Sequence, residues 1–383
     1  MNICMVAYTY YPKDPRVRKE AEALAGNGYS VDIICIRQSG EKREEIINGV
    51  RVFRLPMQTA RESGKLRYVY QYLMFFLLAT FAVSVFHFRK RYHVVHTHSL
   101  PDFIVFAGIF PKLFGAKLVL DLHESMPDIY LSKFNAREGF VYKLVCLAER
   151  ISTSVADAVI TVSEYIAKLL VERRTKKEKL TVIPNVPDID FYPPKCSDAK
   201  DIVFAGNLTE YQDIDTVLDA MVKLPDFKFH IFGDGILLPR IKEKIVKLNL
   251  TNRVFLYGFV PQNELRRKLI TSDWFIAVHP CRNIRLAWIA LGNKALEYTF
   301  LGYVVVSSDM PGVREVFSDE CFYYYLPEDA ESLANAIRLA YSEKVKTIEK
   351  IKKAQEVIRR KGMSWSDVKG KLFQLYSRLT AES

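Results

Sequence analysis

Apolar residues fall into short runs of Val, Ile and Leu that alternate with longer stretches of helical periodicity. The strands predicted in the first half are residues 2–8, 30–36, 50–56, 92–98, 117–124, 157–163 and 179–185. The helices predicted between them are residues 16–28, 68–88, 101–116 and 137–154. Near-continuous apolar strands separated by helices are typical of a parallel sheet covered on both faces. The first half therefore predicts a doubly wound α/β domain.

The same alternation restarts after residues 184–198, which are rich in Pro and Asp and predict a linker. The second half predicts strands at 201–207, 227–235, 253–261, 272–280, 303–308 and 321–326 and a helix at 211–224. An amphipathic tail follows at 364–379, and Ser364 can cap it. Two α/β halves of similar size are therefore expected, with ligands at the carboxyl ends of the strands.

The composition is that of a folded protein, because 49% of the 383 residues are hydrophobic and 26% are charged. The six cysteines are scattered without a CxxC pair, which favours reduced thiols in a cytosolic protein over a disulfide framework. The amino terminus lacks a basic region and a cleavage site, so it predicts a first strand and no signal peptide. No GxGxxG follows that strand, which disfavours a standard NAD fold.

The net charge of +11 is concentrated around one apolar segment. Residues 51–100 contain eight Lys or Arg and one acid, Glu62, while 68–88 contain no charged side chain. A membrane span here would interrupt the strand–helix alternation and break the domain. Two interpretations of this segment remain: a helix buried inside the domain and a helix lying on a membrane surface. The basic clusters within 61–91 favour the second, because they would be attracted to an anionic membrane surface. Nucleic acid is disfavoured, because the aromatic residues are not interleaved with the basic ones.

Several segments, in their order and spacing, resemble the retaining glycosyltransferases of family 4, which have the GT-B architecture. They are "YYPKDPRVRKEAEALAGNGYSVDIICI", "HTHSLPD", "DLHES", "VITVSEYIAKLL", "VIPNVPDIDFY", "FAGNLTEYQDIDTVLDA", "FGDGILLPRIKE", "YGFVPQNELRRKLITSDWFIAVHP" and "NKALEYTFLGYVVVSSDMPGVREVF". The resemblance implies two Rossmann-like domains facing across a cleft, with a C-terminal helix that crosses back. It assigns acceptor binding to residues 1–187 with helix 364–383, and nucleotide-sugar binding to 188–363.

The implied reaction moves a sugar from a UDP- or GDP-linked donor to a glycan or lipid-linked acceptor, in polysaccharide or glycoconjugate biosynthesis. The family retains the anomeric configuration and needs no metal, so helix N-termini, backbone N–H groups and basic side chains must meet the charge on the leaving diphosphate. We expect a cytoplasmic enzyme that is peripheral at the inner face of the membrane. The alternatives are a non-catalytic GT-B partner subunit and a GT-B nucleotide-sugar epimerase.

The donor site is expected around Glu297, which matches the family's ribose-binding glutamate. One carboxylate can accept hydrogen bonds from both vicinal ribose hydroxyls. Three family positions differ here: a second glutamate is replaced by Ile289, and the arginine and lysine that bind the diphosphate are replaced by Asn207 and Gln212. Lys294 lies one helical turn before Glu297 and is the first candidate to supply the missing charge.

Other donor-side candidates follow the ends of strands. Arg282 and Arg285 are further possible cations for the diphosphate, while an ion pair with Glu297 is the structural alternative for Lys294. Gly206 lacks a Cβ and lets the backbone approach the phosphates. By resemblance, Phe259 and Val260 meet the nucleobase through backbone groups.

In the first half, His123 matches a family histidine that bonds to the donor sugar or its phosphate, and with Glu297 it forms the predicted catalytic pair. Glu124, His98 and Arg16 are predicted on the acceptor side. For Arg16, pairing with Asp14 or Glu20 is the structural alternative.

We expect no metal and no cofactor. His96 and His98 point the same way along a strand, but the sequence offers no evident third ligand. The Asp-Ile-Asp triplets at 188–190 and 213–215 are more simply explained as solvated surface or helix-capping residues.

Overall fold

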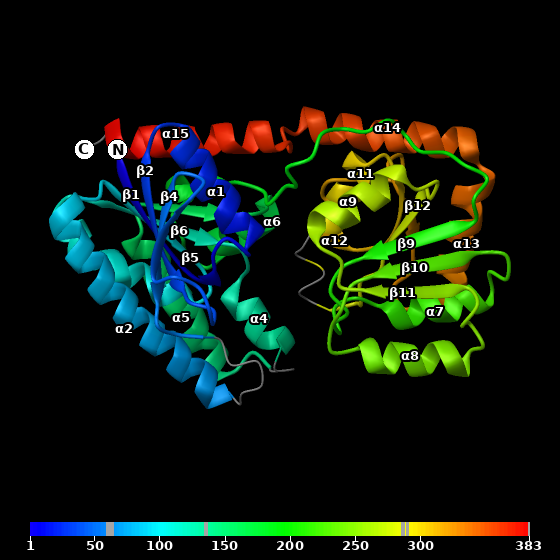
Figure 1. Cartoon of the computed structure of the whole chain (residues 1–383), viewed down its shortest axis with the longest axis horizontal. Helices are drawn as coiled ribbons and strands as arrows, with labels where there is room; N and C mark the ends of the chain where they lie inside the picture. Colours follow the sequence, from blue (N-terminus) through cyan, green and yellow to red (C-terminus); the bar gives the residue numbers. More distant parts are fainter. Residues whose placement is uncertain (59–64, 134–136, 285–287, 289–290, 382–383) are drawn as a thin grey trace. The chain divides into compact units, whose positions relative to one another are not determined.

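The computed structural model describes residues 1–58, 65–133, 137–284, 288 and 291–381. It separates into two compact units (Figure 1): unit 1 is residues 1–185 with 366–383, and unit 2 is residues 186–365. Each boundary lies two residues from the one expected from the sequence. Helix α15 (Trp365–Ala381) therefore returns to unit 1 after the chain has built unit 2.

Unit 1 is built on an eight-stranded sheet in the order β3-β4-β2-β1-β5-β6-β7-β8. The strands are β1 (Asn2–Tyr10), β2 (Ser30–Ile36), β3 (Glu44–Ile47), β4 (Val50–Leu55), β5 (Val94–His98), β6 (Lys117–Leu122), β7 (Ala158–Thr161) and β8 (Leu180–Val182). All neighbours pair in parallel except β3 with β4. That antiparallel edge was not predicted, although Asn48-Gly49 joins the strands with positive φ at both residues, as a two-residue hairpin turn requires.

The helices of unit 1 are α1 (Pro15–Gly26), α2 (Lys65–Lys90), η1 (Asp102–Gly108), α3 (Ile109–Leu113), α4 (Met126–Lys133), α5 (Phe140–Val155), α6 (Glu164–Glu172), η2 (Lys177–Lys179) and α15. The single helix predicted at 101–116 is in fact a 3-10 helix followed by a short α-helix. The amphipathic tail prediction is confirmed, since α15 buries five side chains at helical spacing: Val368, Leu372, Leu375, Tyr376 and Leu379.

Helix α2 has apolar residues on both of its faces, but it packs against the core of unit 1 by only one of them. Phe75, Ala79 and Val83 are fully buried in the core of unit 1. Its C-terminal end is held by Lys90, whose ammonium group lies 2.7 Å from the buried carboxylate of Asp32. Within the described residues, α2 contains the one helical segment, Val69–Lys90, that is long and apolar enough to cross a membrane.

Unit 2 is a six-stranded, all-parallel sheet in the order β11-β10-β9-β12-β13-β14. Its strands are β9 (Asp201–Ala205), β10 (Lys228–Phe232), β11 (Val254–Gly258), β12 (Ile276–His279), β13 (Val304–Ser308) and β14 (Tyr323–Tyr325). Its helices are α7 (Ile214–Val222), α8 (Leu238–Lys247), α9 (Gln262–Thr271), α11 (Asn293–Phe300), α12 (Pro311–Arg314), α13 (Ala330–Ser342) and α14 (Lys344–Arg360). Consecutive side chains of β12 and β13 are buried, so both faces of this sheet are covered, as predicted.

Candidate functional site

The carboxyl end of β9 meets the start of α11 at a place where backbone and side chain approach very closely. Gly206 follows β9, and a Cβ added there would lie 1.8 Å from Cε of Lys294. A Cβ on Gly233, which follows β10, would lie 1.8 Å from the carbonyl oxygen of Gly206. Gly233 therefore needs to be glycine, because its Cβ would meet backbone, whereas a Cβ at Gly206 would meet only the flexible end of Lys294. Gly206 is where Lys294 reaches the edge of the sheet.

Helix α11 is anchored so that its two candidate residues lie at this edge. The backbone N–H of Ala205 donates a hydrogen bond to the buried hydroxyl of Tyr298 at 2.7 Å, which ties the helix to the end of β9. Lys294 and Glu297 lie on the same helix and are both partly exposed. The structure thus brings together Gly206, Lys294 and Glu297, three of the residues predicted for the donor.

Lys294 is a cation held in an unfavourable environment. Burial lowers the pKa of its ammonium group, although Cys281 and Glu297 oppose that shift. Its Nζ lies 5.7 Å from the centre of the Phe204 ring and makes no hydrogen bond with another described residue. A partly desolvated cation of this kind is suited to an anionic ligand that restores its hydrogen bonds.

A buried histidine beneath Lys294 was not identified from the sequence. His279 ends β12, and its Nδ1 lies 3.1 Å from the hydroxyl of Ser307. Burial, together with the nearby charge of Lys294, lowers the pKa of His279 to about 3, so the ring is neutral. A Cβ on Gly292 would lie 2.5 Å from its Nε2. The position at the end of a predicted strand was the available signal, but it did not distinguish this ring from a core histidine.

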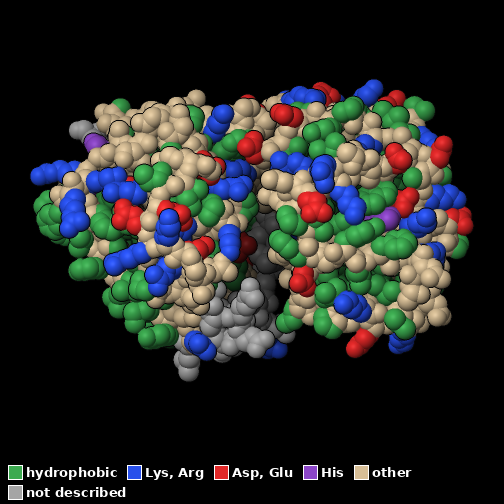
Figure 2. All heavy atoms as spheres, in the orientation of Figure 1, with side chains coloured by type: hydrophobic (Ala, Val, Ile, Leu, Met, Phe, Trp, Pro, Cys, Tyr) green, Lys and Arg blue, Asp and Glu red, His purple; other side chains and the backbone are tan. Residues whose placement is uncertain are grey.

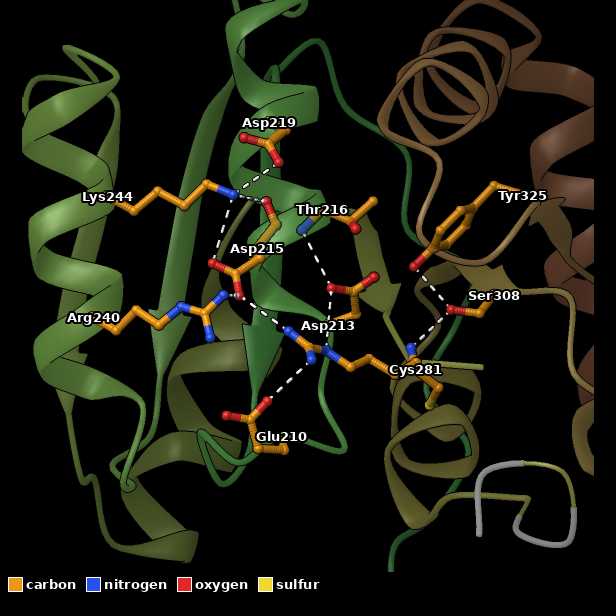
Figure 3. Close-up of polar contacts among 11 residues, drawn as sticks. Glu210, Asp213, Asp215, Thr216, Asp219, Arg240, Lys244, Cys281, Ser308 and Tyr325 are labelled. Atoms are coloured by element: carbon orange, nitrogen blue, oxygen red, sulfur yellow. Dashed lines mark hydrogen bonds and ion pairs between the residues drawn. The ribbon is translucent and has the colours of Figure 1, made fainter. Parts of the chain in front are cut away.

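Arg282 takes part in an ion-pair network and not in an open cationic site. Its guanidinium lies 3.1 Å from a carboxylate oxygen of Glu210, 3.2 Å from one of Asp215 and 3.9 Å from one of Asp213, the three acids labelled in Figure 3. Arg240 pairs with Asp215 as well, at 2.8 Å. Carboxylates of the protein already surround the charge of Arg282, so this geometry favours a structural role over diphosphate binding.

The Asp-Ile-Asp triplet at 213–215 serves the same network. Asp213 caps α7 by accepting a hydrogen bond from the N–H of Thr216 at 3.4 Å, which confirms the capping interpretation. Asp215 is held by Arg240, Arg282 and Lys244. Both carboxylates of the triplet thus have partners in the protein.

The remaining donor-side candidates lie in loops after β9 and β11. Asn207 is exposed, and Gln212 is buried with a backbone bridge to Cys281. Phe259 is 78% exposed, whereas Val260 is partly buried. The predictions that concern Arg285 and Ile289 lie outside the described residues.

In unit 1, two predicted histidines converge on a carboxylate that the sequence analysis did not single out. Asp121 pairs with His98 across β5 and β6. Its Oδ2 lies 3.0 Å from Nδ1 of His98 and 3.1 Å from Nε2 of His123, whose rings are stacked. Although burial by itself raises the pKa of Asp121, His123 and His98 hold it well below its usual range. Asp121 therefore orients both rings.

Two further buried groups adjoin this cluster. Nδ1 of His96 lies 2.7 Å from the hydroxyl of Tyr376 on α15, and Glu20 of α1 is buried beside it. One possible ligand atom from each of Glu20, His96, His98 and Asp121 lies within 4.8 Å of the others. Residues distant in sequence therefore place two further possible ligand groups beside the two strand histidines, which the sequence analysis did not identify.

The other acceptor-side candidates are less enclosed. Arg16 forms an ion pair with Asp14 at 3.2 Å, the structural alternative anticipated for it, and Asp14 also caps α1 by accepting from the N–H of Arg16. Glu124 is exposed directly after the histidine cluster. Of the first-half predictions, the structure brings together His98 and His123.

Comparison with known proteins accounts for nearly the whole chain. Residues 14–186 match the family model described as a glycosyl transferase 4-like domain, and 185–358 match the one described as glycosyl transferases group 1. An uncharacterised glycosyltransferase of Methanocaldococcus jannaschii is 28% identical over 202 residues, which are 48% of this chain and 48% of that protein. The chain thus spans about half the length of this relative.

Solved structures share the fold across the full length. Sucrose-phosphate synthase from Thermosynechococcus elongatus superposes with a TM-score of 0.80, at 20% identity and with 100% of each chain covered. The Anabaena protein HepE, solved in complex with UDP and glucose, gives a TM-score of 0.72 at 16% identity, covering 99% of this chain and 100% of that one. At these identities the likeness concerns the fold, two parallel-sheet α/β domains of the GT-B type.

Proposed function

The chain belongs to the family 4 glycosyltransferases of the GT-B fold, and we propose that it moves a sugar from a nucleotide-sugar donor to a glycan or lipid-linked acceptor. The observation that supports this most directly is the placement of Lys294 against Gly206 beside Glu297, at the carboxyl edge of the sheet in unit 2. Ligands of parallel α/β sheets bind at that edge.

In this proposal, Glu297 accepts hydrogen bonds from the ribose hydroxyls and Lys294 meets the diphosphate. Because Gly206 has no Cβ, the Lys294 side chain can lie against the backbone at the end of β9, where its ammonium group would meet the phosphates. As the sugar–phosphate bond breaks, negative charge grows on the leaving diphosphate. A cation that lacks hydrogen-bond partners stabilises this charge in the transition state more than it stabilises the bound substrate in the ground state. We propose that the reaction retains configuration and needs no metal at the phosphates.

For unit 1, we propose that His123 contacts the sugar or its phosphate. Its Nε2 lies against Asp121, while its Nδ1 is buried without a hydrogen-bond partner among the described residues. A ring held through one nitrogen presents the other in a fixed direction, which is the arrangement needed to bond a substrate hydroxyl. Glu124, His98 and Arg16 remain the proposed acceptor-side residues.

We also propose that unit 1 lies on the inner face of the membrane, so that a lipid-linked acceptor can reach it. Helix α2 exposes an apolar stripe at helical spacing, made of Tyr70, Leu73, Leu77, Phe81 and Phe88. Figure 2 shows hydrophobic side chains gathered on this part of the molecule among Lys and Arg side chains. The exposed Arg67, Arg89 and Arg91 flank the stripe, whereas Lys90 is paired with Asp32.

Helix α5 adds a second apolar stripe that the sequence analysis did not identify: Phe140, Val141, Leu144, Leu147 and Ile151. Both α2 and α5 pack against η1, so the two stripes flank the same segment. Two exposed apolar helix faces near basic residues are typical of proteins that lie in the interface of an anionic bilayer.

The transferase proposal is tested by incubating the full chain with a panel of nucleotide sugars and acceptors and identifying products by mass spectrometry. Transfer to an acceptor supports it. Thermal shifts with UDP and GDP separate the alternatives, because a non-catalytic partner subunit would give no stabilisation by either nucleotide. An altered donor sugar without any transfer would instead indicate an epimerase. HepE was solved with UDP, which makes UDP the first nucleotide to test.

The membrane proposal is tested by sedimentation with vesicles that contain phosphatidylglycerol. Replacing Leu77 and Phe81 together by Glu is expected to abolish binding without lowering the melting temperature, since both side chains are exposed. Val345→Glu, at an exposed apolar position in unit 2, is the matched control and should bind like the wild type. A wild-type protein that ignores these vesicles would contradict the proposal.

A further inference from the structure

We propose that unit 1 binds a divalent transition-metal ion, best matched by Zn²⁺, through Glu20, His96, His98 and Asp121. The four side chains come from α1, β5 and β6, and their possible ligand atoms lie within 4.8 Å of one another. The residues proposed to bind the nucleotide lie in unit 2 and are not among these ligands. The ion would fix the structure of unit 1 and, through His98 and Asp121, would adjoin the residues proposed to contact the acceptor and the sugar.

Regular secondary structure explains why the four groups meet. His96 and His98 are two positions apart on β5, so their side chains lie on the same face of the sheet. There the two rings stack, with their centroids 4.3 Å apart. Asp121 is the partner of His98 in the parallel register of β5 with β6. In a tetrahedral zinc site with bonds of about 2.0–2.2 Å, ligand atoms are about 3.3–3.6 Å apart. Small side-chain rotations would therefore close the cluster around an ion.

Each of the four side chains keeps one buried atom that is unsatisfied within the described part of the chain. These atoms are Oε2 of Glu20, Nε2 of His96, Nε2 of His98 and Oδ1 of Asp121. The residues are between 0% and 8% exposed, so water does not cover them freely. Buried polar atoms normally have a hydrogen-bond partner, and four atoms that lack one in a single cluster indicate a shared ligand.

The outer contacts fit the pattern of metal-bound histidines. A ligating imidazole usually donates its second N–H to an oxygen, which fixes the tautomer and leaves the other nitrogen free for the metal. Nδ1 of His96 faces the hydroxyl of Tyr376 at 2.7 Å, and Nδ1 of His98 faces Oδ2 of Asp121 at 3.0 Å. In both rings Nε2 is thus the nitrogen left for an ion.

The donor set favours zinc among divalent ions. Imidazole suits Zn²⁺ and other late first-row ions better than Mg²⁺ or Ca²⁺, and the two carboxylates balance the charge of a divalent ion. Four buried protein ligands form a closed set, as in structural zinc sites. A bound ion would link α1, β5 and β6 and, through Tyr376, the C-terminal helix α15.

The experiment measures metal bound to the full chain. After purification without a metal-affinity step and dialysis against metal-free buffer, mass spectrometry of the elements is expected to find about one Zn²⁺ per chain. His96→Gln and His98→Gln should lose that ion. His230→Gln is the matched control, because His230 is a buried histidine of unit 2 whose two nitrogens already face Asp201 and Tyr257.

Two further measurements keep the proposal falsifiable if the histidine variants do not fold. A chelator is expected to lower the melting temperature of the wild type, and added Zn²⁺ to restore it. Co²⁺ in place of Zn²⁺ should give the visible absorption of a tetrahedral site, lost in Glu20→Gln. A wild-type protein without metal, with a melting temperature insensitive to chelator and to Zn²⁺, would show that the cluster shares protons internally and would overturn the proposal.

Discussion

Lys294→Met is the substitution that tests the proposed donor site most directly. The wild-type ammonium group lies against Gly206, is partly desolvated and makes no hydrogen bond to another described residue. A hydrogen bond to a charged group contributes about 1.5–3 kcal/mol, and each 1.4 kcal/mol is a factor of ten in affinity. We therefore expect UDP or GDP to bind about 10- to 140-fold more weakly to the variant.

The same substitution should leave the fold intact. Burial lowers the pKa of Lys294, which means that the folded protein holds the charged form at a cost. Methionine has a similar length and no charge, so the melting temperature should be unchanged or higher. Loss of affinity together with retained stability separates a binding role from a structural one.

Isothermal titration calorimetry with UDP and GDP, at low and moderate salt, provides the measurement. Lys294→Arg keeps the positive charge and should retain more affinity than the methionine variant. Lys242→Met removes one exposed positive charge from α8 and should bind like the wild type. The reasoning is refuted if Lys294→Met binds nucleotide as the wild type does, or if Lys242→Met shows the same loss.

Four other substitutions probe the same unit. Gly233→Ala should lower the free energy of unfolding by about 1–3 kcal/mol in urea titrations, because its Cβ would lie 1.8 Å from a backbone oxygen. Gly206→Ala meets only the flexible end of Lys294, so it should weaken nucleotide binding with a smaller loss of stability. Arg282→Met should lower the free energy of unfolding by about 1–2 kcal/mol, since two of its three carboxylate partners, Asp213 and Asp215, are largely buried, whereas Glu210 is exposed and the guanidinium is partly solvated. His279 is neutral in the folded protein, where its pKa is about 3. The stabilisation from the neutral ring is therefore present above pH 6.5 and is lost as the pH falls towards 3. Between pH 7 and 4.5 the free energy of unfolding of the wild type should fall by about 2–3 kcal/mol more than that of His279→Gln.

Each of these has an outcome that contradicts it. Equal stability of Gly233→Ala and the wild type would mean that the loop after β10 can move away. If Gly206→Ala binds UDP and GDP unchanged, the close approach has no role in the donor site. Wild-type stability in Arg282→Met, combined with lost nucleotide binding, would restore the diphosphate role for Arg282. Parallel pH–stability curves for wild type and His279→Gln would show that this ring does not titrate as stated.

Much of the fold could be predicted because the signals are local. Buried strands of both units have apolar residues at successive positions, and their helices repeat every three or four residues, so the elements follow from short windows of sequence. The antiparallel strand β3 was missed although Asn48-Gly49 signals a hairpin, because its own sequence, Glu-Glu-Ile-Ile, alternates poorly. The predicted helix 101–116 was likewise correct in place but not in its 3-10 start.

The candidate site could likewise be predicted from local sequence only in part. Glu297 and Lys294 are one helical turn apart, so their common placement on α11 was a local inference. The contact of Lys294 with Gly206, the three carboxylates around Arg282 and the neutral His279 beneath Lys294 involve residues far apart in sequence. No periodicity records such contacts, because they depend on which strands are neighbours in the sheet.

The sequence by itself determined the alternation of strands and helices, the two units, the family and the residues that can carry charge. Only the tertiary structure decided which charges are matched within the protein, as for Arg282, and which are held without a hydrogen-bond partner among the described residues, as for Lys294. It also gave His96 and His98 the nearby Glu20 and Asp121. The physical reason is that periodicity sets the face of each element, whereas sheet order and register set which faces meet.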